Sequence, residues 1–230
     1  MTASDEHFMV DEGLLARITG YARLSPTDIV LEAGAGTGNL TRHLALSGCR
    51  VIACEFNKRY YAKLHELGRE FPNIKPVQGN VLKAQISGYD KVVSNLPYSI
   101  SRQFLKMMIL SGFELAVLVV QKEFAEKLVA RPGSGNYRMV SALAQSAAKL
   151  EILEDVAPAA FEPQPNVMSA VVRMERARDC SRRYLDFLNT LFNQRNKKLR
   201  NILDNVPKGC HDMRPRDMGP NDFLSLFETI

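Results

Sequence analysis

The sequence predicts an α/β protein in which a doubly wound, mostly parallel sheet is followed by a small helical C-terminal domain. Short apolar runs rich in Val, Ile and Leu alternate with amphipathic stretches over the first three quarters of the chain, a pattern typical of strands and helices in turn. A Gly-rich turn, residues 31–38 (LEAGAGTG), follows the first apolar run. After Glu175 the composition shifts to a basic segment with helical apolar spacing.

The apolar runs are expected to form strands that are buried on both faces of the sheet. They are short and carry little polar alternation, as in parallel strands covered by helices on both sides. A weaker candidate is residues 74–78 (IKPVQ), because Pro76 suits the edge or the end of a sheet. The expected strands are residues 28–33, 50–55, 74–78, 91–94, 115–121 and 167–174.

Amphipathic stretches between these strands are expected to form the covering helices, at residues 39–47, 58–68, 101–110 and 122–130. Polar loops are expected at residues 131–137, which are rich in Gly, and at residues 158–166, which are rich in Pro. Two further helices are expected in the C-terminal part, at residues 184–192 and 223–227.

A domain boundary is placed between residues 177 and 178, where the composition shifts. It separates a first domain, residues 1–177, from a second, residues 178–230. The second domain is too small to be stable without docking onto the first.

Composition and charge favour a soluble protein with a polyanionic partner. The formal net charge is +5, and 24% of the residues are charged. The four cysteines form no C-x-x-C pair, so we expect reduced cysteines and no metal site. The sequence contains no apolar run long enough to span a membrane, and the acidic, polar residues at its start lead us to expect no signal peptide. We therefore expect a cytoplasmic protein without a membrane partner, and nothing requires more than a monomer.

Two features predict an adenosine-containing cofactor at the carboxyl ends of the first strands. Glycines such as Gly34 and Gly36 suit a tight turn where the backbone approaches a ligand. Glu55 ends the second strand, where a carboxylate can accept hydrogen bonds from both ribose hydroxyls. These features alone fit NAD as well as S-adenosylmethionine, although the spacing is G-x-G-x-G and not the dinucleotide pattern G-x-G-x-x-G.

The segment Ser94 to Ser99 (SNLPYS) at the end of the fourth strand favours methyl transfer to an adenine amine. The side-chain oxygen of Asn95 and the carbonyl of Leu96 offer acceptors for the two N–H bonds of that amine, which would turn its lone pair toward the methyl group. Pro97 fixes the backbone and Tyr98 offers a ring on which the base can stack. Taken by itself, the segment is equally compatible with an ordinary strand-capping turn.

Taken together, these motifs resemble the rRNA adenine N6,N6-dimethyltransferase family over nearly the whole chain. The matching segments, in family order, are residues 7–11 (HFMVD), 32–38, Glu55, 95–98 (NLPY), 121–123 (QKE), 161–172 (beginning FEPQPNV), 192–195 (FNQR) and 197–201 (KKLRN). The resemblance implies a Rossmann-like class I methyltransferase that uses S-adenosylmethionine. It implies that residues 1–177 form the catalytic domain and that residues 178–230, short for the family, recognise RNA.

The resemblance also implies roles for single residues. The cofactor would be bound by His7, Met9, Gly34, Gly36, Glu55, Asn80 and Asn95, although the family usually has Asp where Asn80 stands. Glu6-His7 likewise replaces the more common Gln-His or Gln-Asn of the family. Phe161 would stack on the flipped adenine opposite Tyr98, which would offset the cost of unstacking the base.

A basic run in the C-terminal part is a candidate phosphate-binding patch, which would make RNA affinity fall with salt. It is too compact to face in one direction on a helix, so some of its members are expected to be solvated surface residues. Two arginines that flank the Gly-rich loop are weaker candidates. The candidate RNA-binding residues are Arg195, Lys197, Lys198, Arg200, Arg131 and Arg138.

We expect the enzyme to methylate the N6 amines of two adjacent adenosines near the 3′ end of small-subunit rRNA, in an assembling particle during ribosome biogenesis. One alternative is a methyltransferase of the erythromycin-resistance type, which acts on large-subunit rRNA and shares the N-[LI]-P-Y and F-x-P-x-P elements. Another is an rRNA-binding assembly factor that uses the cofactor as a checkpoint. A nicotinamide oxidoreductase is improbable because of the motif at Asn95.

Overall fold

The computed structural model describes residues 6–229, which form two compact units. The first unit comprises residues up to 125 together with residues 151–175, and the second comprises residues 126–150 and 176–230. The boundary expected at 177/178 lies close to one of these junctions. No sequence pattern indicates that residues 126–150 belong with the second unit; they do so because they carry a helix that packs on the two long helices of that unit.

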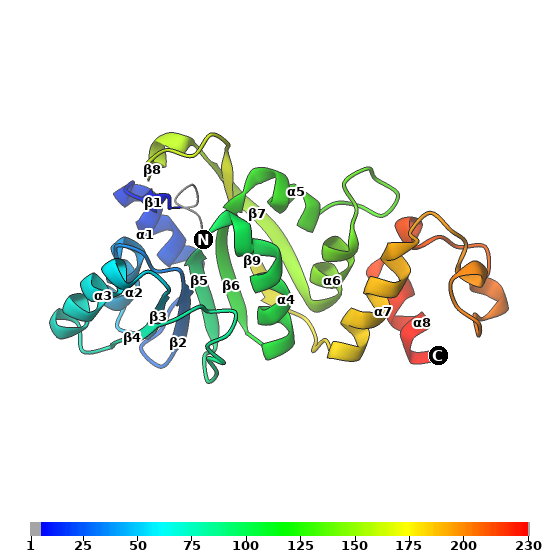
Figure 1. Cartoon of the computed structure of the whole chain (residues 1–230), viewed down its shortest axis with the longest axis horizontal. Coiled ribbons are helices and arrows are strands. Elements are labelled where there is room, and N and C mark those ends of the chain that lie inside the picture. Colours follow the sequence, from blue (N-terminus) through cyan, green and yellow to red (C-terminus); the bar gives the residue numbers. More distant parts are fainter. Residues whose placement is uncertain (1–5, 230) are drawn as a thin grey trace. The chain divides into compact units, whose positions relative to one another are not determined.

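A seven-stranded sheet forms the centre of the first unit, in the order β4-β3-β2-β5-β6-β9-β7 (Figure 1). The strands from β4 to β6 run parallel, and β9 pairs antiparallel with β6. The strand bounds are β2 (Ile29–Ala33), β3 (Arg50–Glu55), β4 (Ile74–Gln78), β5 (Lys91–Asn95), β6 (Leu115–Gln121), β7 (Ala148–Val156) and β9 (Ser169–Arg176).

The doubly wound arrangement that the sequence predicts is confirmed. Every residue of β6 except the last is buried, so both faces of the sheet are covered at its centre. The strand containing Pro76 lies at the sheet edge, where its missing N–H costs no ladder bond. The helices that accompany these strands are α1 (Glu12–Tyr21), α2 (Asn39–Leu46), α3 (Lys58–Glu70), α4 (Ser101–Ser111) and α5 (Lys122–Leu128).

A second, two-stranded sheet joins the N-terminal segment to the segment before β9. In it, β1 (Phe8–Met9) pairs antiparallel with β8 (Phe161–Glu162), and Met9 lies opposite Phe161. Both residues have side chains that are 2% exposed and belong to the main core. This pairing fixes the N-terminal segment beside the carboxyl ends of the parallel strands, because residues 6–9 line one cavity together with the ends of β2, β3 and β5.

The second unit is built around three helices that contact one another: α6 (Met139–Ala147), α7 (Arg182–Asn193) and α8 (Pro220–Thr229) (Figure 1). Aromatic rings fill the space between them, with Tyr184 and Phe227 edge to face at 5.2 Å between ring centroids. The Tyr184 hydroxyl is buried and shares a hydrogen bond of 2.8 Å with Ser146. None of the helices in the described part of the chain is long and apolar enough to cross a membrane.

Candidate active site

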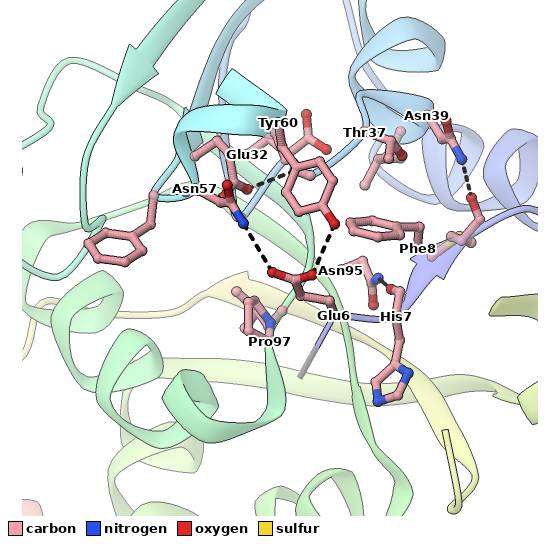
Figure 2. A pocket seen from close by; sticks show the side chains of 18 of the residues that line it. Glu6, His7, Phe8, Glu32, Thr37, Asn39, Asn57, Tyr60, Asn95 and Pro97 are labelled. Carbon is pink, nitrogen blue, oxygen red and sulfur yellow. Dashed lines mark hydrogen bonds between the residues drawn. The ribbon is translucent and has the colours of Figure 1, made fainter. Parts of the chain in front are cut away.

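A cavity of about 590 Å³ lies at the carboxyl ends of β2, β3 and β5, where ligands bind in doubly wound sheets (Figure 2). Its walls come from the N-terminal segment, the turn after β2, the end of β3 with the start of α3, and the segment after β5. Of the residues expected to bind the cofactor or catalyse, it brings together His7, Met9, Gly34, Gly36, Glu55, Asn95, Leu96, Pro97 and Tyr98.

The Gly-rich turn forms the floor of this cavity and requires glycine at two positions. Gly34 and Gly36 have φ angles of +72° and +56°, in the left-handed region that side chains disfavour. A Cβ atom on Gly36 would lie 2.7 Å from the Phe8 ring, and one on Gly34 would lie 3.0 Å from the Pro97 ring. The glycines therefore let the backbone pass between the N-terminal segment and the segment after β5.

Glu55 lies at the end of β3, where its side chain is 5% exposed and is held by two hydrogen bonds. One carboxylate oxygen accepts from the backbone N–H of Gly36 at 2.9 Å, and the other accepts from that of Asn57 at 2.6 Å. A carboxylate oxygen has lone pairs for more than one hydrogen bond, so both atoms keep capacity for ligand hydroxyl groups. This geometry suits the expected ribose contact.

Asn95 ends β5 with its side chain in a fixed orientation. Its Nδ2 donates to the backbone carbonyl of His7 at 2.9 Å (Figure 2). Because a carbonyl can only accept, the amide nitrogen must face His7, and Oδ1 is left as the acceptor. Oδ1 is thus the atom of Asn95 that could receive an amine N–H, and the catalytic role of this residue stays a prediction.

The three residues after Asn95 differ in their exposure. Leu96 is buried, and its N–H donates to the Val119 carbonyl at 3.1 Å. Tyr98 is half-buried, and its hydroxyl shares a hydrogen bond of 2.6 Å with Ser169 on β9. The hydrogen bond holds the phenol ring at the cavity wall, with its centroid 5.6 Å from that of the His7 ring.

The N-terminal segment is attached to the cavity by several polar contacts. Nδ1 of His7 lies 2.8 Å from the Pro163 carbonyl, and the Asn39 amide donates to the Met9 carbonyl at 2.7 Å. The Glu6 carboxylate accepts from the Tyr60 hydroxyl at 2.9 Å and from the Asn57 amide at 3.2 Å (Figure 2).

Sequence reasoning missed Glu6, Asn39, Asn57 and Tyr60 because nothing in their local patterns predicts such distant partners. It also missed Glu32, which lines the cavity. Here a signal was present, since an acid inside the apolar run 28–33 is unusual.

Two expected site residues lie outside the cavity lining. The side-chain oxygen of Asn80 accepts from the Leu82 N–H at 3.0 Å and so caps the turn after β4. The Phe161 side chain is 2% exposed and packs in the core, because its strand pairs with β1. In this conformation the Phe161 ring offers no face to a base. Cofactor binding by Asn80 and base stacking by Phe161 therefore stay predictions.

The candidate RNA-binding residues all belong to the second unit and mostly have partners within the chain. Lys198 and Arg200 both pair with Asp212, at 2.8 and 2.6 Å. Arg195 donates to the Tyr137 carbonyl at 2.9 Å, and Lys197 to the Gln194 side chain at 2.8 Å. Arg138 bonds to carbonyls of its own loop, at Gly135 and Tyr137, and Arg131 is exposed. Their role in binding RNA stays a prediction.

The parallel sheet, the Gly-rich turn and the acid at the end of β3 fit an enzyme with an adenosine-containing cofactor, and the solved structures that share this fold define the class: a Rossmann-like class I methyltransferase. Two solved structures share this fold over 96% of the chain. A dimethyladenosine transferase from Plasmodium falciparum superposes with a TM-score of 0.85 at 25% identity, and 96% of that chain is covered. The 23S rRNA methyltransferase ErmE gives 0.75 at 27% identity, with 98% covered.

The chain belongs to the ribosomal RNA adenine dimethylase family, whose sequence profile matches residues 2–216. A relative, the probable ribosomal RNA small subunit methyltransferase A of Methanosarcina mazei, is 36% identical over 248 residues, covering 98% of this chain and 91% of that protein. The predictions of a class I fold and of an S-adenosylmethionine-dependent rRNA methyltransferase are confirmed by this membership.

Proposed function

We propose that this enzyme dimethylates the N6 amines of two adjacent adenosines near the 3′ end of small-subunit rRNA, in an assembling particle during ribosome biogenesis. The observation that carries the proposal is the orientation of Asn95, whose amide nitrogen is engaged by His7 so that its oxygen faces an incoming amine. The M. mazei relative, named for the small subunit, supports the choice of RNA.

S-adenosylmethionine fits the chemistry of the cavity. The volume of about 590 Å³ lies within the roughly 300–1,000 Å³ of small-molecule sites. We propose that Glu55 holds the ribose hydroxyls and that the turn at Gly34 and Gly36 allows close approach of the backbone. His7 and Met9 would cover the cofactor from the N-terminal segment. When bound, the cofactor supplies an electrophilic methyl group on a sulfonium.

The residues of the chain then act on the target base. Adenine N6 is a poor nucleophile because its lone pair is delocalised into the ring. We propose that the Asn95 oxygen and the Leu96 carbonyl accept its two N–H bonds, so that the lone pair is redirected toward the methyl group. Tyr98, anchored by Ser169, provides the ring on which the extruded base stacks.

A transfer assay tests this proposal. The purified enzyme is incubated with labelled S-adenosylmethionine and either small-subunit particles lacking these methyl groups or naked large-subunit rRNA. We expect N6,N6-dimethyladenosine in nucleosides from the small-subunit particles alone. Transfer confined to large-subunit rRNA would assign the chain to the erythromycin-resistance type, and tight particle binding without transfer would make it an assembly factor.

A further inference from the structure

Glu32 is a buried acid in the cavity wall for which the proposed transfer reaction has no use. It lies on β2, one residue before the strand ends, and its side chain is 2% exposed. Its Oε2 has no hydrogen-bond partner of normal geometry among the described residues. An unpartnered carboxyl oxygen at a cavity wall is costly unless a ligand satisfies it.

The electrostatic surroundings of Glu32 disfavour its charged form. It forms no ion pair within residues 6–229, and the charge that acts on it most directly is the negative charge of Glu55. Burial is the main cause that raises the pKa of Glu32 to about 8; the nearby Thr41 hydroxyl opposes the rise, and the negative charge of Glu55 adds to it. The other titratable groups of the cavity wall are Glu6, His7, Lys58, Tyr60 and Tyr98.

We infer that Glu32 is a neutral acid in the cofactor-free enzyme and becomes the ionised counter-charge of a cationic cofactor, so that cofactor binding expels its proton to solvent. The inference rests on the proposed use of S-adenosylmethionine. That molecule carries a sulfonium and an ammonium against one carboxylate, and is a net cation. Its positive charge would supply the missing partner of Glu32, whose side chain is itself buried, so that an opposite charge acts on it strongly.

Two consequences follow from this linkage. Affinity for S-adenosylmethionine rises by about tenfold per pH unit below about pH 8 and levels off above it, because one proton leaves for each cofactor bound. A ligand with the same adenosine but without a cation, such as 5′-methylthioadenosine, leaves Glu32 protonated. The acid therefore favours the charged cofactor over neutral adenosine thioethers.

Isothermal titration calorimetry in buffers of different ionisation enthalpy counts the protons released. At pH 7 we expect the wild-type enzyme to release close to one proton with S-adenosylmethionine and none with 5′-methylthioadenosine. Glu32→Gln, which mimics the neutral acid, is expected to release none with either ligand. The α-amino group of the cofactor has a pKa of roughly 7.7–8.0 and can also exchange protons on binding. Subtracting the proton release of Glu32→Gln from that of the wild type removes the contribution of this group.

Glu6→Gln is the matched control, because it neutralises another carboxylate of the same cavity wall and is expected to keep the proton release. Wild-type binding without proton release would overturn the inference, and so would equal release by Glu32→Gln. Equal release with 5′-methylthioadenosine would show that the cation is not the cause. Failure of S-adenosylmethionine to bind at all, with 5′-methylthioadenosine also inert, would instead overturn the proposed function on which the inference rests.

Discussion

The side-chain amide of Asn95 donates to the backbone carbonyl of His7 across 2.9 Å, and this bond sets the direction in which the side-chain oxygen of Asn95 points. The acceptor is main chain, so its position depends on how the N-terminal segment is attached to the cavity. The orientation of the Asn95 side chain at the end of β5 is therefore coupled to a segment 88 residues earlier in the chain.

The Asn95→Asp variant tests whether transfer needs a correctly oriented side-chain oxygen at this position or only an oxygen that can accept a hydrogen bond. The carboxylate keeps oxygen atoms but cannot donate to His7, so it is repelled from the carbonyl and loses its orientation. We expect single-turnover methyl transfer to fall by roughly 10²-fold or more, with the dissociation constant of S-adenosylmethionine little changed. Ser99→Ala, an exposed neighbour, is the control. Near-normal transfer by Asn95→Asp would remove Asn95 from catalysis.

Gly36→Ala tests the close approach of the Gly-rich turn to the N-terminal segment. The new methyl group would collide with the Phe8 ring at a backbone φ of +56°, so we expect a loss of roughly 1–3 kcal/mol in unfolding free energy and weaker cofactor binding. Gly20→Ala is the matched control. It lies in α1 with no atom within 4 Å of its would-be Cβ, and we expect a gain of roughly 0.5–1 kcal/mol. Urea unfolding of both variants gives the comparison, and equal stabilities would refute it.

Glu55→Gln tests the ribose site. Its two oxygens accept from two backbone N–H groups, and the amide of Gln would place a donor against one of them, which costs about 1–3 kcal/mol. We expect weaker binding of both S-adenosylmethionine and 5′-methylthioadenosine, since both carry the ribose. Calorimetric titration measures both affinities. Unchanged affinity for the thioether would place the ribose elsewhere.

The buried acid predicts how stability depends on pH. The pKa of Glu32 is about 8 in the folded protein against a usual value of 4.5, so between these values the folded state holds a proton that the unfolded state has lost. The free energy of unfolding therefore falls as pH rises through this window, by at most about 1.4 kcal/mol per pH unit from this group, and the fall ends above pH 8. The Glu32→Gln variant lacks this pH-dependent contribution to the free energy of unfolding. Parallel stability curves for the two proteins, measured by urea unfolding, would contradict it.

The ion pairs of Asp212 are expected to compete with RNA binding. It pairs with both Lys198 and Arg200, two of the candidate phosphate ligands. We expect Asp212→Asn to tighten RNA binding and steepen its salt dependence, and Lys197→Ala to weaken binding and reduce the salt slope by about 1. Asp204→Asn, an exposed acid of the same segment, controls for net charge. Equal effects of the two Asp variants would mean that general charge, and not the pairing, decides affinity.

The central strands and the site motifs could be predicted because they are local in the sequence. Burial on both faces gives β6 an unbroken apolar run, and the turn at Gly36 needs glycine whatever its partners are. Strand β7 was not predicted, because its residues mix charged and apolar side chains at the sheet edge.

What could not be predicted depends on contacts between distant segments. The Glu6 contacts to α3, the Asn39 contact to Met9 and the burial of Phe161 all follow from where the fold places the N-terminal strand. No periodicity in the sequence encodes that placement. For Phe161 in particular, a motif match gives the residue type but not the direction in which its ring faces.

Mapping the modified nucleotides on the rRNA is the decisive test of the proposed methyl transfer. Small-subunit particles lacking the methyl groups are incubated with the enzyme and S-adenosylmethionine, and fragments of the rRNA are sequenced by mass spectrometry, with Asn95→Ala as the inactive control. We expect two adjacent N6,N6-dimethyladenosines near the 3′ end, and none with Asn95→Ala. Methyl groups at other positions, or full dimethylation by Asn95→Ala, would contradict it.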